Sequence, residues 1–571
     1  MSLWRIGVVV IEMTLFASCA TGSPTAPSVQ SESRSPAAER VLTMSIALEP
    51  NYIAAFAPLP PAGATDFWQR MFNAFLDLYD GQGRPVPYLA EALPKLNTDS
   101  WTVLPDGRME TKYHLKPNLV WHDGAPLTAD DFVFTYSVMA PSNGFRTATV
   151  PYNLMDDVVA TDDRSLTIRW KSVYPDAGVL LLGDVKFGLV PLPRHILEKV
   201  FNQSIEAFQQ DPYWSHEFVG AGPFKLDRWE LGSYLEAVAF DQHVLGRPKI
   251  DRIRLLFVSD QNTAFANLLS GTTDVALDTI SFAHFLQLKQ EWAATHQGTA
   301  GFTVASFTAA YIQHRPDYVN PRALQDIRVK KALAYGIDKQ TMADTVWAGE
   351  LAVLDTIFDP RAEYYPSIDR AITKYSYDPR MSERLMNDAG YQKGADGFFA
   401  SPAEGKLTFN LISPQTRAEP PVLAGNWRQA GFDIQEQPLS AVEERDPQLR
   451  STFPALYVQA SGLTEGQQIG RYRSSEIGTA DNHWRGDNYT GWKNAAFDQL
   501  AEAFNVTLDP DERVRQRAEM AKIMSEDLPA IMLTDNPNPH AYLARVKNVT
   551  PSPPYHTTGR ITWNIEQWEL Q

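Results

Sequence analysis

The chain has almost no cysteine. Cys19 is the only one among 571 residues. A single thiol excludes a disulfide within the chain and any metal site built from several cysteines. The length suggests about three or four domains. With 44% hydrophobic and 21% charged residues, the composition has ample material for buried cores and is not that of a disordered chain.

Positive charge is also in short supply. Lys and Arg total 51 against 68 Asp and Glu, which gives a formal net charge of −17. Such a surface repels nucleic acid and anionic lipid headgroups, so neither is expected as a partner of the folded body. The acidity suits a cationic ligand, and it equally suits a plain solvated surface.

Familiar catalytic signatures are missing. The sequence has no G-x-S-x-G or H-E-x-x-H motif, and the glycines at 220–222 are not followed by the G-K-[ST] of a phosphate loop. The pairs Glu443-Glu444 and Asp156-Asp157 are the candidates for a secreted hydrolase. Neighbours on a strand point to opposite faces, however, whereas glycosidase carboxylates face each other across roughly 5 to 9 Å. The hydrolase is therefore the alternative of another class, and we expect no enzyme, catalytic residue or cofactor.

A short apolar run opens the chain. Residues 6–16 fall short of the about 20 residues that span a bilayer. Residues 15–19, LFASC, resemble a bacterial lipobox, in which a peptidase cuts before a cysteine that is then diacylated. We expect 1–18 to be a lipoprotein signal peptide, Cys19 to be lipidated and 19–40, rich in Ser, Pro, Thr and Ala, to be a flexible tether. Plain secretion is the alternative.

Residues 101–139 carry the most informative pattern. Thr111, Tyr113 and Leu115 alternate with polar neighbours, which is the period of a half-buried strand. Further on, Thr128 stands three residues before Asp131 and ahead of apolar residues at helical spacing, which is typical of a capped helix start. The stretch therefore predicts a strand, a turn and a helix.

Motifs in this stretch and beyond it resemble one known family. They are Trp101, Asp106-Gly107, His114-Leu115, Trp121-His122-Asp123-Gly124, Leu127 to Phe134, Gly220 to Leu226, Gly271 to Ala276, Ile327 to Lys339, Tyr377 to Pro379 and Trp563 to Trp568. Together they are similar to the family 5 extracellular solute-binding proteins, the peptide-, oligopeptide- and nickel-binding receptors of bacterial ABC importers. The resemblance covers nearly all of 41–571 in blocks, and it implies that the His122-Asp123 turn is scaffold rather than a metal or acid/base pair.

The resemblance implies an α/β fold of two lobes, a periplasmic-binding-protein-like clamp of type II with an extra subdomain in the first lobe. We expect lobe I at 41–305 with the subdomain at about 85–215, lobe II at 306–535 and a return to lobe I at 536–571. Ligand contacts to both lobes would favour the closed state. The expected function is capture of a small solute by a monomer, which delivers it to an ABC permease and its ATPase from the periplasm or from the outer face of the cytoplasmic membrane. A sensor or chaperone with the same fold stays open.

Local patterns near the C-terminus predict further elements. Phe497 and Phe504 share a helix face, and Asp509 begins a second helix. Residues 529–533 predict a short strand, and 536–539 a crossing back to lobe I.

The resemblance also suggests where the ligand lies. The family's peptide binders neutralise the peptide amino terminus with an aspartate soon after a tryptophan-containing strand, because a buried charge without a partner is costly. The matching segment, 453–465, has neither residue, and Glu465 is the candidate substitute. Tyr457, Gln459 and Ser461 would line one wall as alternate side chains of a strand. The remaining candidates, each with a structural role as an equal alternative, are Asp278, Thr279, Tyr152 and Arg146.

The kind of solute stays open. A peptide or oligopeptide is expected, with an oligosaccharide, an opine-like conjugate or a metal chelate as alternatives. Segments 471–473 and 483–485, Arg-Tyr-Arg and His-Trp-Arg, could stack a sugar or clamp a carboxylate. Their simpler interpretation is surface cations on an acidic protein. The histidines at 483, 540 and 556 are too scattered to predict a metal site.

Overall fold

The computed structural model describes residues 39–55, 66–140, 150–180, 188–462, 465–552 and 560–571. The chain divides into Met1–Glu39 and a compact unit, Arg40–Gln571, which holds the described helices and strands. The expected signal peptide, Cys19 and Arg146 lie outside the described residues. Among the residues that are described, no helix is both long and apolar enough to cross a membrane.

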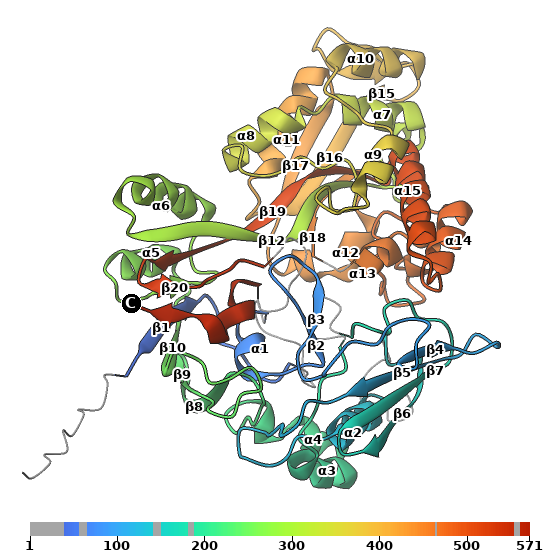
Figure 1. The fold of residues 1–571 in the computed structure, drawn as a ribbon. Helices are drawn as coiled ribbons and strands as arrows, with labels where there is room; N and C mark the ends of the chain where they lie inside the picture. The colour runs from blue at the N-terminus through green and yellow to red at the C-terminus, as the bar shows by residue number, and fades with distance from the viewer. Residues whose placement is uncertain (1–38, 56–65, 141–149, 181–187, 463–464, 553–559) are drawn as a thin grey trace, which may run out of the picture. The chain divides into compact units, whose positions relative to one another are not determined.

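A ten-stranded sheet organises this unit, in the order β17-β16-β18-β12-β19-β11-β1-β10-β9-β8 (Figure 1). Its strands are β1 (Val41–Ile46), β8 (Phe224–Glu230), β9 (Tyr234–Ala239), β10 (Arg252–Phe257), β11 (Val275–Ala276), β12 (Gly298–Ile312), β16 (Thr408–Pro414), β17 (Asp433–Leu439), β18 (Leu456–Ser461) and β19 (Ala530–Leu543). Strands far apart in the sequence are therefore neighbours in the sheet.

Two long strands, β12 and β19, run through the middle of the sheet. They pair antiparallel from Gly298 opposite Leu543 to Tyr311 opposite Ala530, with register shifts between Val304 and Ser306 and between Thr308 and Ala309. The start of β12 pairs with the end of β19, which pairs on its other side with β11. The end of β12 pairs with β18. The prediction of a short strand at 529–533 was wrong, because β19 continues through the expected crossing at 536–539.

The buried apolar residues form separate cores on either side of these strands. One cluster draws on residues 42–277 and 546–568, whereas two others draw only on residues 307–533. The unit therefore has two lobes, each with its own hydrophobic core, joined by β12 and β19.

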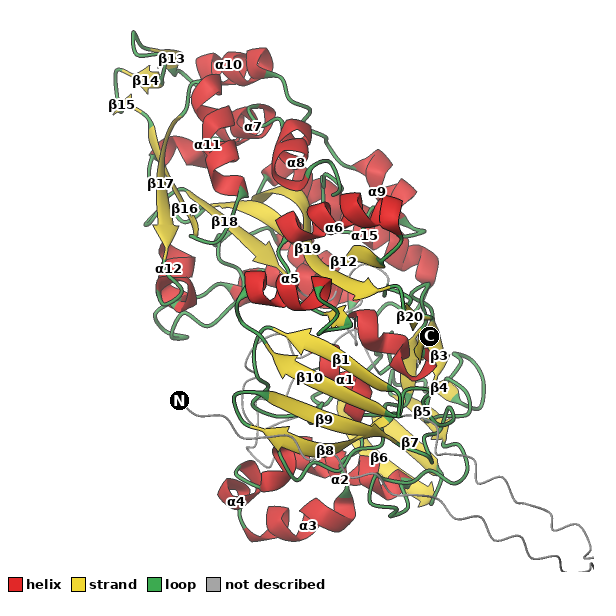
Figure 2. Cartoon of the chain, turned by 90° about the vertical axis from the view of Figure 1, so that its left-hand side faces the viewer, coloured by secondary structure: helices red, strands yellow, loops and turns green. Residues whose placement is uncertain are grey.

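The first lobe combines the β1 end of the large sheet with smaller elements. These are β2 (Asp77–Tyr79), β3 (Pro85–Pro87), β4 (Trp101–Val103), β5 (Met109–His114), β6 (Met155–Asp162), β7 (Ser165–Trp170), β20 (Val546–Lys547), β21 (Glu569–Leu570), α1 (Asp66–Phe72), α2 (Ala129–Met139), α3 (Arg194–Gln203), α4 (Ile205–Gln209), α5 (Gln261–Leu269) and α6 (Phe282–Thr295). Strand β5 and helix α2 confirm the predicted strand and helix, and the Asp131 carboxylate accepts a hydrogen bond from the Thr128 amide at 2.8 Å. Helix α2 packs against β6 and β7 of the four-stranded sheet β4-β5-β7-β6, and Figure 2 shows α2, α3 and α4 together at the bottom of the view.

The second lobe packs helices on both faces of β16, β17 and β18. Its other elements are α7 (Ile327–Tyr335), α8 (Lys339–Trp347), α9 (Tyr365–Ala371), α10 (Pro379–Asp388), α11 (Glu419–Ala430), α12 (Pro447–Thr452), α13 (Glu465–Arg471), α14 (Ala495–Phe504), α15 (Pro510–Asp527), β13 (Gln392–Lys393), β14 (Phe399–Ser401) and β15 (Gly405–Lys406). One core holds side chains of α7, α10 and α11, and the other holds those of α9, α14 and α15. The predicted C-terminal helix pair is confirmed, and Asp509 caps α15 by accepting from the amides of residues 511 and 512.

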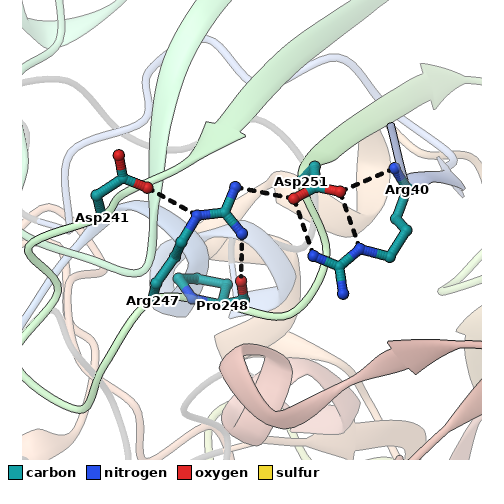
Figure 3. A network of polar contacts seen from close by, with 5 residues as sticks. All are labelled: Arg40, Asp241, Arg247, Pro248 and Asp251. Atoms are coloured by element: carbon teal, nitrogen blue, oxygen red, sulfur yellow. Dashed lines mark hydrogen bonds and ion pairs between the residues drawn. The ribbon is translucent and has the colours of Figure 1, made fainter. Parts of the chain in front are cut away.

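A polar network fixes the start of β1 (Figure 3). The Asp251 carboxylate accepts from the Arg40 amide and Nε, both at 2.9 Å, and from Arg247 Nη2 at 2.8 Å. Arg247 in turn donates to Asp241 at 2.7 Å. Hydrogen bonds from Arg40 hold the pKa of Asp251 well below its usual range. The first residue of the folded unit is thereby tied to the loop before β10.

Candidate functional site

Both lobes contain parallel strands. In lobe II, β16 pairs parallel with both β17 and β18. In lobe I, β1 pairs parallel with both β10 and β11. Ligands of open α/β sheets bind outside the carboxyl ends of such strands, because loops and helix starts gather there. The segments that follow these six strands are therefore the candidate ligand-binding site.

Two of the three side chains predicted on β18, Tyr457 and Gln459, are hydrogen-bonded to each other, whereas Ser461 has other partners. Gln459 Nε2 donates to the Tyr457 hydroxyl at 3.1 Å and to Glu444 Oε1 at 3.0 Å. Ser461 Oγ accepts from Arg471 Nη1 at 2.7 Å. Tyr457 itself is fully buried and packs its ring against Tyr311. Strand β18 thus carries a continuous polar row to the carboxyl edge, with its aromatic end in the core.

Glu465 begins α13 immediately beyond this edge. Its carboxylate oxygens accept from Arg517 Nε at 2.6 Å and from Arg517 Nη2 at 2.7 Å, a fork-to-fork pair. The Tyr364 hydroxyl donates to the same carboxylate at 2.9 Å. The expected amine anchor therefore already has a full counter-charge, which the sequence does not reveal.

Asp176 and Arg513 bring the two lobes into contact, and sequence patterns did not single out either residue. Arg513 Nη2 of α15 lies 3.9 Å from Asp176 Oδ1 in the segment after β7. Burial raises the pKa of the Asp176 carboxyl, although 46% of its side-chain surface is accessible to solvent, and the Arg513 charge opposes the rise.

The candidates in the first lobe have structural partners. Asp278 Oδ1 accepts from the Ala47 amide at 2.8 Å, which ties the ends of β1 and β11 together, and burial raises its pKa. The Thr279 hydroxyl is 2.8 Å from that of Ser45. Tyr152 is buried, and its hydroxyl donates to the carbonyl of Gly188 at 2.7 Å.

Arg471 corrects an expectation. The interpretation of segment 471–473 as surface cations was wrong for this residue, because only 7% of Arg471 is exposed. Its Nη1 donates to the hydroxyls of Tyr311 and Ser461. The burial of a cation at the end of α13 is the feature that sequence reasoning underestimated.

His122 lies within the scaffold, as the resemblance implied. Its Nδ1 accepts from the Gly220 amide at 3.2 Å, and its Nε2 faces the Gly222 carbonyl at 3.0 Å. A ring that accepts at one nitrogen and donates at the other is neutral, and burial lowers the pKa of His122 to about 4. Two of the sequence motifs thus bind each other.

Three of the four carboxylates considered for a hydrolase have partners within the described parts of the chain. Glu443 accepts from the Ser440 amide and hydroxyl, Glu444 from Gln459, and Asp157 from Arg169. No group of three or more His, Cys, Asp or Glu side chains there could hold a metal ion. The arrangement suits binding by hydrogen bonds and charge.

Comparisons with known proteins agree with this geometry. Residues 91–472 match the family described as bacterial extracellular solute-binding proteins, family 5 middle. The oligopeptide-binding protein AppA of Bacillus subtilis is 25% identical over 512 residues, which cover 88% of this chain and 87% of AppA.

Solved structures share the fold. A periplasmic oligopeptide-binding protein of Thermotoga maritima superposes with a TM-score of 0.75 at 19% identity, over 93% of this chain and 99% of that one. NikA of Brucella suis, in complex with Fe(III)-EDTA, gives a TM-score of 0.74 at 17% identity, over 93% and 100%. These likenesses confirm the expected two-lobed α/β fold. The chain belongs to family 5 of the bacterial extracellular solute-binding proteins, which serve ABC importers.

Proposed function

We propose that this protein captures a peptide or oligopeptide between its lobes and delivers it, chemically unchanged, to an ABC permease and its ATPase. The observation that carries the proposal is the carboxyl edge of β16, β17 and β18 in a family 5 fold, where β18 and α13 place the polar residues Gln459, Ser461 and Glu465. The name of AppA supports a peptide.

A non-peptide solute is the second candidate. NikA has the same fold and was solved with a metal chelate, and the acidic partners of Arg517 and Arg513 show that these two charges are already matched. An oligosaccharide, an opine-like conjugate or a metal chelate would use the same edge.

The movement that closes the lobes is assigned to β12 and β19. The boundaries proposed for lobe II, 306 and 535, fall beside the register shift between Val304 and Ser306, where Asn536 and Pro537 lie opposite. A register shift locally interrupts the ladder of hydrogen bonds, which supports bending there.

Ligand capture is tested by thermal unfolding of purified residues 20–571 with pooled di- to pentapeptides, oligosaccharides and metal chelates. A peptide pool that raises the midpoint, with no product formed, supports the proposal. Stabilisation by another pool alone contradicts the peptide assignment and leaves the receptor in place. Turnover of any pool would support the secreted hydrolase.

The role of Glu465 is tested by Glu465→Gln. If the carboxylate neutralises a peptide amine despite its pairing with Arg517, affinity should fall by about tenfold or more, since a charge-assisted bond is worth about 1.5 to 3 kcal/mol. Titration calorimetry with the best peptide measures this. Unchanged affinity would assign Glu465 to holding Arg517 in place.

A lipid anchor is part of the proposal. Cleavage before Cys19 and acylation of its thiol would hold the folded unit at the membrane through residues 19–40. Mass spectrometry of the mature protein should find a diacylated Cys19 at the N-terminus, and Cys19→Ala should move the protein to the soluble fraction.

A further inference from the structure

Two arginines of the second lobe approach one tyrosine ring. The guanidinium carbon of Arg471, at the end of α13, is 5.3 Å from the centroid of the Tyr489 ring, and that of Arg450, in α12, is 5.2 Å away. Arg471 is 7% exposed, Tyr489 is 7% exposed and Arg450 is half-buried. The chain thus concentrates two positive charges in one partly desolvated place.

The hydrogen-bond partners of these arginines are all neutral. Arg471 Nη1 donates to the Tyr311 hydroxyl at 3.2 Å and to Ser461 Oγ at 2.7 Å, and Arg450 Nη1 donates to the Tyr489 hydroxyl at 3.3 Å. Among the described residues, no carboxylate oxygen lies within 4.0 Å of either guanidinium group. The Nε of each is buried without an acceptor, as is that of Arg70 in the first lobe. Burying a cation is costly unless an anion accompanies it.

Arg70 shows how the same fold treats a buried arginine elsewhere. Together with Arg471 it is one of the two arginines that are less than a tenth exposed in the described residues. Arg70 also lies over a tyrosine ring, that of Tyr88, but its Nη2 donates to Glu566 at 3.0 Å. The Arg471 cluster has the arginine and the tyrosine, but the Asp487 carboxylate acts on Arg471 only electrostatically and is not within 4.0 Å.

The Arg471 cluster lies at the place where a ligand is expected. Ser461 is the last residue of β18, on the carboxyl edge of the second lobe's parallel strands. Its hydroxyl is also one of the acceptors of Arg471. A ligand group at this edge can therefore supply the charge that the chain does not.

We propose that Arg471 and Arg450 bind a carboxylate of the captured solute, with the Tyr489 hydroxyl as an additional donor. A carboxylate has two coplanar oxygens that match the guanidinium fork, and two cations raise the affinity for it. The Tyr489 hydroxyl accepts from Arg450, so its own proton is left to donate. The inference rests on the proposed function and narrows the ligand to solutes with a carboxylate. Peptides, opine-like conjugates and acidic sugars share that group.

The first experiment needs no knowledge of the solute. Thermal unfolding of the folded unit is compared in sodium formate and in sodium chloride at equal ionic strength, for wild type, Arg471→Met and Arg515→Met. Arg515 is 71% exposed and paired with Glu512, so its variant matches the change in net charge away from the cluster.

Formate should stabilise wild type and Arg515→Met more than chloride does, and this excess should disappear in Arg471→Met. If Arg471→Met does not fold, Arg450→Met takes its place, with the same expectation. An equal response of wild type to formate and chloride overturns the proposal. So does an excess that persists in both cluster variants.

The second experiment identifies the source of the carboxylate. The peptide pool is offered with free and with amidated C-termini, beside a pool of uronic-acid oligosaccharides. Amidation, or Arg471→Met, should weaken peptide binding by about tenfold or more. Equal binding of amidated peptides overturns the proposal and leaves the peptide-binding function standing. A formate effect without peptide binding supports the carboxylate site and contradicts the peptide assignment.

Discussion

Two buried arginines, Arg70 in the first lobe and Arg471 in the second, each lie over a tyrosine ring and donate to a tyrosine hydroxyl, but they differ in their carboxylate contact. Arg70 Nη1 donates to the Tyr88 hydroxyl at 2.9 Å, and Arg471 Nη1 donates to the Tyr311 hydroxyl at 3.2 Å. Of the two, only Arg70 has a carboxylate within 4.0 Å, that of Glu566. A charge with its counter-charge inside the fold holds the lobe together, whereas a charge without one is available to a ligand.

The hydrogen bonds between Arg70, Tyr88 and His243 have fixed directions. His243 lies 3.1 Å from the Gly246 carbonyl through Nδ1 and 2.8 Å from the Tyr88 hydroxyl through Nε2. The carbonyl only accepts, so Nδ1 donates and Nε2 accepts from Tyr88, whose oxygen accepts from Arg70. Every group in this chain of bonds has one fixed role, which is what a structural network requires.

Removing Arg70 should have the largest effect. Arg70→Met leaves the Glu566 carboxylate buried and alone, so the free energy of unfolding should fall by about 3 to 5 kcal/mol. Urea denaturation followed by tryptophan fluorescence measures the loss. The double variant Arg70→Met/Glu566→Gln should recover part of it, because no charge is then left unpaired. Equal losses in the single and double variants would show that packing, not the ion pair, makes the contribution.

Lowering the pH should have the second-largest effect on stability, through His243 of the Arg70 network. Burial, with the Arg70 charge as a second cause, lowers the pKa of His243 to about 3. Below pH 6.5, His243 is protonated in the unfolded chain but stays neutral in the folded chain. Its contribution to the free energy of unfolding is therefore fully present at neutral pH and is lost as the pH falls from 6.5 toward 3. The loss from this one histidine should reach about 2 kcal/mol at pH 5.

The measurement is the dependence of the urea midpoint on pH for wild type and His243→Gln. The variant should show a shallower decline between pH 7 and pH 5, by up to about 1.4 kcal/mol per pH unit. Arg471→Met leaves His243 and its partners unchanged, so it should decline as steeply as wild type. Parallel curves for wild type and His243→Gln would contradict the account.

Removing Arg471 from the ligand-free protein should have the smallest effect. Arg471→Met leaves no carboxylate without an ion-pair partner, so the free energy of unfolding should change by at most about 1 kcal/mol, in either direction. The same urea denaturation without solute measures it, beside Arg70→Met. A loss as large as that of Arg70→Met would make Arg471 a structural residue and remove the difference between the two lobes.

Local patterns predicted much of the fold. The strand and helix of 101–139 and the pair α14 and α15 rest on periodicity and capping, which act between near neighbours. The length of β19 was missed because Pro537 and Pro539 break a strand pattern. Both prolines lie in the segment paired with β12, and the β11 pairing begins only at residues 541–542, so this segment is open on its other side.

The candidate site was only partly predictable. The β18 row of Tyr457, Gln459 and Ser461 follows from alternation, which is local. The partner of Glu465 is 52 residues away in α15, and the contact of Asp176 with Arg513 joins the two lobes. No spacing rule links such residues. The family motifs, which include His122, mark scaffold, and they do not name the side chains that meet the solute.

The central claim is that the molecule holds a carboxylate-bearing solute and releases it unchanged. Native mass spectrometry of the protein, incubated with the free-carboxylate peptide pool and then denatured to release its ligand, tests this most directly. The account predicts a one-to-one complex whose released ligand has the mass of an intact pool member, and no such complex for Arg471→Met. A complex that forms equally with amidated peptides, or a ligand recovered as cleaved fragments, would contradict it.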